Sequence, residues 1–115
     1  MMHRNAPAYR KGDRERLAKL HSLPCAACVI DGNQAVCGKT EAHHFKSGNK
    51  RIGHQSTIAL GQWHHQGIPL DGYTHGQMEL IFGPSLARSP KSFRERYGTD
   101  GELLERTNDL LEKDR

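Results

Sequence analysis

Cysteines and adjacent histidine pairs constrain this chain more than any other feature of its sequence. The residues concerned are Cys25, Cys28, Cys37, His43, His44, His64 and His65. A chain of 115 residues has room for one domain with a modest core. Tetrahedral zinc takes four Cys or His ligands, and two of them commonly lie on a tight Cys-x2-Cys turn. The pattern therefore predicts a small domain that a structural zinc ion stabilises.

Other uses of the cysteines are less consistent with the sequence. Cys-x2-Cys also occurs in redox proteins, but no βαβ pattern surrounds it here. The cysteine count is odd, and no apolar run follows the basic N-terminus, which argues against both a secretory signal and a disulfide framework. No stretch approaches the roughly 20 apolar residues that a membrane span needs. We therefore expect a cytoplasmic protein that does not enter a membrane.

Positive charge is concentrated in the first half of the chain. Residues 1–51 carry ten of the 17 Lys and Arg but only four of the 13 Asp and Glu. Such an excess commonly binds a polyanion, nucleic acid first, although it can equally be a solvated surface that keeps the protein in solution. Residues 1–12 predict a flexible basic arm, and residues 13–115 predict the folded domain.

The expected secondary structure is short and mixed. Asp13 is placed to cap a helix that ends before Pro24. Residues 34–36 and 41–45 could pair as strands, a Gly-rich basic loop follows at 46–54, and residues 56–60 predict the return strand. Residues 61–66 begin a short helix that Gly67 and Pro69 end.

The C-terminal third predicts two helices with a scaffold role. Ser89 and Pro90 begin the first, Gly98 ends it, and Thr99 with Glu102 forms a capping box for the second. Leucines then recur on one helical face, at 103, 104, 110 and 111. This spacing indicates core packing rather than chemistry.

Each histidine pair is suited to two different centres. Adjacent side chains point to opposite faces of a strand, as expected for His43 and His44. On a helix, as expected for His64 and His65, they diverge by about 100°. One histidine can therefore hold a structural ion while the others line a reactive cleft.

The order of these motifs resembles the ββα-metal finger of HNH endonucleases. More closely, the segments EAHHFKSGNKRIGHQSTIALGQWHHQGIP and FGPSLARSPKSFRERYGTDGELL resemble the family of RecA-dependent nucleases typified by a phage recombination-enhancement protein. The resemblance covers roughly residues 25–111. It implies an α+β domain with a central metal finger and flanking helices. It also implies metal-dependent, endonucleolytic hydrolysis of DNA, acting with a RecA filament in recombination or repair, in a phage or prophage setting within a bacterial host cell.

The resemblance also assigns roles to particular histidines. His44 would be the general base, and His43 and His65 would bind a catalytic divalent cation, which is Mg²⁺, Mn²⁺, Ni²⁺ or Zn²⁺. An imidazole at position 43 suits a transition metal better than Mg²⁺. The family generally has a cysteine ligand where this chain has Gly61. We therefore infer that Cys37 replaces it.

The resulting zinc set is Cys25, Cys28, Cys37 and His64.

Further residues are candidates for phosphate contacts. Lys46, Lys50 and Arg51 lie in the basic loop, and Arg10 and Lys11 would extend the track along the arm, as would Arg4, Arg14 and Arg16. His54 and His75 could complete a metal shell or contact phosphate, or be polar loop residues. The alternative function is a zinc-stabilised module that binds DNA or a recombinase and cuts nothing.

Overall fold

The computed structural model describes residues 11–33, 36–47, 50–51 and 55–113. Within these ranges the chain forms an α+β arrangement of six helices and four short strands. In chain order they are α1 (Lys11–Leu20), α2 (Ala26–Asp31), β1 (Thr40–His44), β2 (Lys46–Ser47), β3 (Lys50–Arg51), β4 (Thr57–Gly61), α3 (Gln62–Gln66), α4 (His75–Phe82), α5 (Pro90–Tyr97) and α6 (Asp100–Lys113). No helix in the described part of the chain has the length and apolar character needed to cross a membrane.

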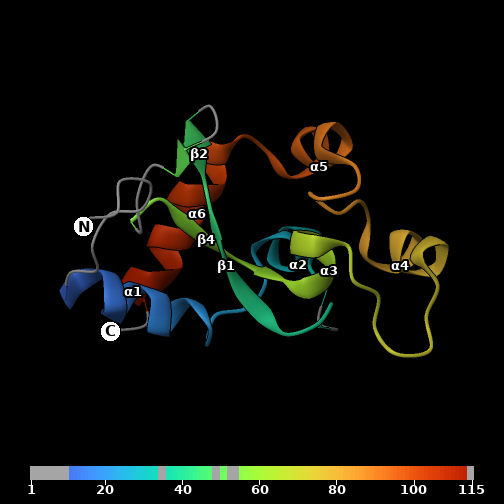
Figure 1. The fold of residues 1–115 in the computed structure, drawn as a ribbon, viewed down its shortest axis with the longest axis horizontal. Helices are drawn as coiled ribbons and strands as arrows, with labels where there is room; N and C mark the ends of the chain where they lie inside the picture. The colour runs from blue at the N-terminus through green and yellow to red at the C-terminus, as the bar shows by residue number, and fades with distance from the viewer. Residues whose placement is uncertain (1–10, 34–35, 48–49, 52–54, 114–115) are drawn as a thin grey trace, which may run out of the picture.

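An antiparallel pair of strands lies at the centre of the molecule. β1 pairs with β4 so that Thr40 is opposite Gly61 and His44 is opposite Thr57. Figure 1 shows α1 and α6 on one side of this pair, and α4 and α5 at the opposite end of the molecule. Because α3 begins immediately after β4, the segment from β1 to α3 has the expected strand–strand–helix order.

β4 contributes to two apolar cores because its side chains alternate between its two faces. Ile58 and Leu60 belong to the larger cluster with Trp63 and Phe93, whereas Ala59 belongs to a smaller one beneath α1 and α6. All five β4 residues are buried. The strand therefore holds the two halves of the domain together.

The strands predicted at 41–45 and 56–60 are confirmed as β1 and β4, but the pairing predicted for the first of them is wrong. β1 pairs with β4, not with residues 34–36, of which Val36 is in no strand and residues 34–35 lie outside the described structure. The segment predicted as a loop contains a further short pair, in which Lys46 is opposite Arg51 and Ser47 is opposite Lys50. Because β4 is buried along its whole length, its pairing with β1 satisfies backbone groups that water does not reach.

The C-terminal helices have the predicted ends, although the Ser89 side chain makes no capping hydrogen bond at the start of α5. α5 begins at Pro90 and ends before Gly98. The Glu102 amide donates to Thr99 Oγ1 at 3.2 Å, and the Thr99 amide donates to Glu102 Oε1 at 2.9 Å. Leu103 is buried in the larger core. The predicted capping box at the start of α6 is therefore confirmed.

Two other helix expectations need correction. α1 begins at Lys11, so Asp13 lies in its first turn rather than at its cap, and the Asp13 carboxylate accepts a hydrogen bond from Gln55 Nε2 at 2.8 Å. A second helix, α4, was not predicted. It begins with a complete capping box between Thr74 and Gln77. The separation of residues 1–12 from 13–115 stays a prediction, since residues 1–10 lie outside the described structure.

Candidate metal centre and active site

Three thiols and one imidazole meet in the interior of the domain. Cys25 immediately precedes α2, Cys28 lies in its first turn, Cys37 precedes β1, and His64 lies on α3. All four are buried, and all three cysteines are free. Their ligand atoms lie within 4.8 Å of one another. The structure therefore brings together the whole predicted zinc set, and the cysteine pair lies on a helix start rather than on an isolated turn.

The spacing of these atoms matches a tetrahedral site. His64 Nδ1 lies 3.3 Å from Cys25 Sγ, 3.7 Å from Cys28 Sγ and 3.2 Å from Cys37 Sγ. Zinc bond lengths of about 2.3 Å to sulfur and about 2.0 Å to nitrogen place such atoms roughly 3.5 Å apart in a tetrahedron. Thiolate and imidazole are the donors that zinc prefers in closed structural sites. The residues present therefore fit a structural zinc ion.

The orientation of the His64 ring is fixed from behind. Its Nε2 lies 2.8 Å from the carbonyl oxygen of Phe82 and therefore carries the proton, so that Nδ1 faces the sulfurs. Tyr97 lies against the same carbonyl at 2.8 Å, and its hydroxyl is 2.7 Å from Asp31 Oδ2. A ligating histidine commonly donates its other ring N–H in this way, which fixes its tautomer. Helices α2, α4 and α5 thus meet behind the metal-facing imidazole.

Cys37 occupies the space beside Gly61. A Cβ at position 61 would overlap Cys37 Sγ and would lie 3.7 Å from the Cys25 Cβ. Gly61 has φ −67°, a backbone conformation that any residue can adopt. Glycine is needed here because the Cys37 sulfur approaches so closely that it leaves no room for a side chain. This contact supports the inference that the ligand missing from position 61 is supplied from position 37.

Within the ion-free cluster the favoured thiolate is Cys25, because hydrogen bonds with Cys25 and Cys37 and burial hold the pKa of the Cys28 thiol well above its ordinary value. Hydrogen bonds from Cys28 and Cys37 hold the pKa of the Cys25 thiol well below its ordinary value. Burial lowers the pKa of His64, but its contacts with the sulfurs of Cys25 and Cys37 outweigh burial and raise that pKa to about 10. In the absence of an ion, the imidazole is therefore an imidazolium paired with thiolate. A metal ion would take the place of that proton.

A second pair of imidazoles lies outside this cluster. The rings of His43 on β1 and His65 on α3 have centroids 5.1 Å apart, at an interplanar angle of 69°. Imidazoles that share one tetrahedral ion have centroids roughly 5 Å apart, since each nitrogen lies about 2.0 Å from the metal. His64 faces the sulfurs, whereas His65 faces His43 and Glu41, so the two adjacent imidazoles point to different surroundings. A cation shared by His43 and His65 stays a prediction.

The two imidazoles differ in their surroundings: His43 is largely buried, and His65 lies beside a carboxylate. Burial, with a contribution from the nearby His65, lowers the pKa of His43 to about 4, so His43 is neutral at neutral pH. His65 Nδ1 lies 2.9 Å from Glu41 Oε1. Gln66 Nε2 donates to the same oxygen at 2.5 Å. Glu41 is a site residue that the sequence analysis missed, although its position two residues before His43 on a strand would have placed it on the same face.

An open cleft of about 370 Å³ adjoins His43. It is lined by His43, His44, Phe45, Leu86, Pro90, Arg94 and Asp100. Arg94 on α5 and Asp100 on α6 form an exposed ion pair, with Nε and Oδ1 3.4 Å apart. The C-terminal helices were predicted to be scaffold only, but they supply charged side chains to this cleft. No local motif could have indicated this, because the contact depends on how α5 packs.

The remaining predicted histidines lie elsewhere. His75 is the first residue of α4, and its ring lies 6.2 Å from that of Trp63. Apart from Cys25, Cys28, Cys37 and His64, the described residues contain no group of three metal-ligating side chains with closely spaced donor atoms. His75 is therefore not brought into a multi-ligand site. His54 lies outside the described residues.

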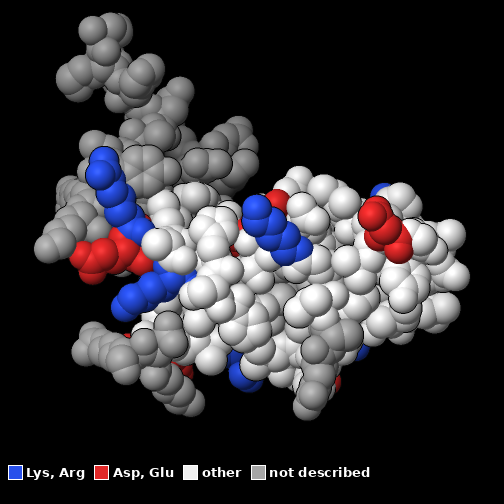
Figure 2. Space-filling view, turned by 90° about the horizontal axis from the view of Figure 1, so that it is seen from below, with Lys and Arg blue, Asp and Glu red and all other residues white. Residues whose placement is uncertain are grey.

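The predicted phosphate contacts are only partly described. Arg10 and Arg4 lie outside the described residues, as do the side chains of Lys11, Lys46, Lys50 and Arg51. On the face shown in Figure 2, the described Lys and Arg side chains lie in separate places, with Asp and Glu among them. A DNA track along the basic loop and arm therefore stays a prediction.

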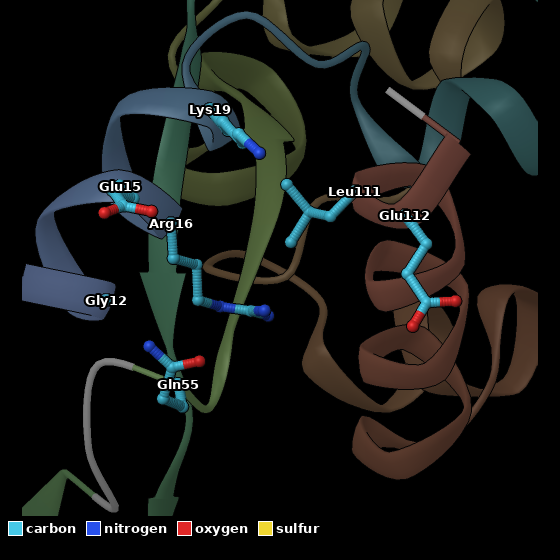
Figure 3. Close-up of a pocket in the computed structure, with 7 residues that line it drawn as sticks. All are labelled: Gly12, Glu15, Arg16, Lys19, Gln55, Leu111 and Glu112. Carbon is cyan, nitrogen blue, oxygen red and sulfur yellow. The ribbon is translucent and has the colours of Figure 1, made fainter. Parts of the chain in front are cut away.

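Arg16 has a structural role instead. Figure 3 shows it extending from α1 into a hollow of about 260 Å³ that Leu111 and Glu112 of α6 also line. Its guanidinium donates to Thr57 Oγ1 at 2.9 Å, to the Thr57 carbonyl at 2.6 Å and to Asn108 Oδ1 at 2.8 Å. These bonds join α1, β4 and α6. Arg16 thus braces these three elements, and its place in a phosphate track stays a prediction.

The fold and its cluster define a small α+β protein with a candidate zinc site. A protein-family model described as "Recombination enhancement, RecA-dependent nuclease" matches residues 10–112. The chain belongs to this family, which confirms the resemblance inferred from its sequence. The family description indicates a nuclease that acts in recombination with a link to RecA. A search of curated proteins finds no match to the chain.

Proposed function

We propose that this protein is an HNH-type endonuclease that hydrolyses DNA phosphodiesters with a divalent cation. It acts on strands engaged by a RecA filament, in phage or prophage recombination or repair. The observation that carries the proposal is the pairing of His43 with His65, whose ring centroids are 5.1 Å apart, beside a cleft that His44 also lines. Membership in the nuclease family supports the same activity.

Two metal sites have separate roles in this proposal. Cys25, Cys28, Cys37 and His64 hold a structural zinc ion, which fixes α3 against the loop before β1. His65 follows His64 directly, so the structural site also sets the position of His65, a ligand of the catalytic cation. His43 and His65 hold the catalytic cation. When bound, that cation supplies Lewis-acid chemistry at the phosphate and the leaving 3′ oxygen.

The protein side chains perform the remaining steps. His44, in its neutral form, accepts a proton from the attacking water through an imidazole nitrogen. A histidine suits this step because its ordinary pKa lies near neutral pH. Arg94 lines the cleft and forms an exposed ion pair with Asp100. When DNA binds, the Arg94 guanidinium leaves Asp100 and donates hydrogen bonds to a phosphate oxygen of the strand.

A cleavage assay with matched histidine variants tests the proposal. The substrates are supercoiled plasmid and single-stranded DNA coated with RecA and paired with a homologous duplex, each with Mg²⁺, Mn²⁺ or Ni²⁺. His44→Ala should lose cleavage by at least 100-fold while keeping its zinc and its fold. His21→Ala is the control, since His21 is exposed and contacts the Thr40 carbonyl at 3.1 Å. It should cleave as the wild type does.

Cleavage that is equal in wild type and His44→Ala would contradict the assignment of the base. A wild type that cuts nothing in any of these metals, with or without RecA, would contradict the nuclease proposal as a whole. DNA binding without cutting would then favour the non-catalytic, zinc-stabilised module.

A further inference from the structure

Glu41 on β1 contacts α3 at His65, the histidine proposed to bind the catalytic cation. Its carboxylate oxygen Oε1 lies 2.9 Å from His65 Nδ1, and Gln66 Nε2 donates to the same oxygen at 2.5 Å. Both side chains of this pair are about a quarter exposed, at 24% for Glu41 and 23% for His65. The pair is therefore partly shielded from water yet open to a ligand.

The positions of these residues follow from the periodicities of their elements. Glu41 and His43 are two residues apart on β1 and so lie on the same face. His65 and Gln66 lie one turn along α3 from Gln62, which contributes a further hydrogen bond to Glu41. One side of β1 thus meets one side of α3, and Glu41 lies in that contact beside the paired imidazoles.

The hydrogen bond to Glu41 fixes the state of the His65 ring. A carboxylate accepts, so Nδ1 must carry a proton, and in the neutral ring Nε2 then keeps its lone pair. Histidines that bind metals usually donate their second ring N–H to a carboxylate, carbonyl or water.

We propose that Glu41 is the positioning residue for the catalytic cation, because it holds His65 in the tautomer and orientation that present Nε2 to the ion. This inference rests on the proposed function, since it assumes a cation between His43 and His65. Glu41 acts through His65 and does not bind the ion itself. Within the described chain, only the Cys3His cluster has three or more ligand atoms grouped within 4.8 Å, so Glu41 forms no three-ligand site with His43 and His65.

A purely structural tether between β1 and α3 would make the same contact. It would fix the same tautomer of His65, but its loss would leave the affinity for a cation unchanged. On the zinc-loaded protein, the ring ¹⁵N shifts of His65 at pH 8 without added metal test the tautomer. The Kd for Mn²⁺, from the free Mn²⁺ signal in electron paramagnetic resonance, separates the two roles.

The expected results are specific. His65 in the wild type should be the Nδ1–H tautomer, and Glu41→Ala should move it toward the Nε2–H form. Glu41→Ala should weaken Mn²⁺ binding by about 10- to 100-fold, the usual effect of removing such a partner. Glu41→Gln, which retains an acceptor oxygen without its charge, should lose less. Gln66→Ala, the matched control, removes the other bond to Glu41 and should change the Kd less than about threefold.

The outcomes distinguish this inference from the function on which it rests. An Nε2–H tautomer in wild-type His65, or equal Mn²⁺ affinity in wild type and Glu41→Ala, would overturn the role of Glu41. A wild type that binds no Mn²⁺ beyond its structural ion would contradict the proposed cation site itself. If Glu41→Ala loses zinc or helical circular dichroism, Glu41→Gln and the wild-type tautomer decide the question.

Discussion

The sulfur of Cys37 fills the space into which a side chain at Gly61 would project. Cys37 lies just before β1, and Gly61 ends β4, opposite Thr40. Both positions therefore border the same metal-binding cluster, and only one of them can hold a side chain. A cysteine at position 61 and the sulfur of Cys37 therefore exclude each other in this fold.

Because the two positions compete for the same space, we predict that the zinc ligand at position 37 can be replaced by a cysteine at position 61. Cys37→Ala should lose most of its zinc because three ligands remain, and Gly61→Cys alone should be destabilised because its Cβ overlaps Cys37 Sγ. The double variant Cys37→Ala/Gly61→Cys should recover zinc and thermal stability relative to either single variant. Zinc content and Tm measure the effect. A double variant no better than Cys37→Ala would show that position 61 cannot supply a ligand.

Neighbouring histidines on α3 should differ in the consequences of their loss. His64→Ala removes a zinc ligand from a fully buried position and should lower the zinc content and the Tm. His65→Ala should keep both but lose cleavage by at least 100-fold, because it removes a ligand of the catalytic cation. Metal analysis, thermal melts and the plasmid assay on both variants check this. Similar melts for the two variants would contradict the separation of structural and catalytic sites.

Zinc binding should release protons and should weaken as the pH falls. The thiols must be deprotonated to ligate, and His64, whose pKa is raised to about 10 in the ion-free cluster, must give up a proton to the solvent. Titration calorimetry at pH 7 in buffers of different ionisation enthalpy gives the number released. An apparent heat that does not depend on the buffer would contradict the prediction. Chelation of the ion should lower the Tm.

Burial of His43 should make the stability of the folded protein depend on pH. Its pKa is lowered to about 4 in the fold, against about 6.5 in the unfolded chain. The unfolded state therefore binds more protons between these values, so this contribution to stability is complete above about pH 6.5 and is lost progressively as the pH falls toward 4. The wild-type curve should be steeper there than that of His43→Gln, by up to about 1.4 kcal/mol per pH unit. Urea unfolding at several pH values tests this, and parallel curves would refute it.

Arg94 should contribute to substrate binding through the cleft. Arg94→Ala removes a guanidinium that lines the cleft beside His43 and His44, and should raise KM for DNA by roughly 10-fold or more, as expected for a charged hydrogen bond. Arg106→Ala is the control, because Arg106 on α6 lines a different hollow with Ala26 and Val29. Cleavage kinetics at several salt concentrations are the measurement. Equal KM values for the two variants would exclude a phosphate contact from Arg94.

Much of this protein was determined by local sequence. Capping residues such as Thr99 and Glu102 fixed the start of α6, since they satisfy backbone groups within one turn of themselves. The helical angle between His64 and His65 was enough to predict that their rings point in different directions, one toward the sulfurs and the other toward His43 and Glu41. The zinc set followed from the Cys-x2-Cys spacing together with the resemblance to the nuclease family, whose missing ligand at Gly61 pointed to Cys37, and the four ligand atoms do meet.

Only the tertiary structure decided which distant residues meet. The pairing of β1 with β4 rather than with residues 34–36, the arrival of Arg94 and Asp100 at the histidine cleft, and the bond from Glu41 to His65 join segments far apart in sequence. Arg16 was interpreted from its charge, but its hydrogen bonds to Thr57 and Asn108 depend on the packing of α1 against α6. Capping and ligand chemistry act over a few residues, whereas these contacts depend on packing that no local pattern encodes.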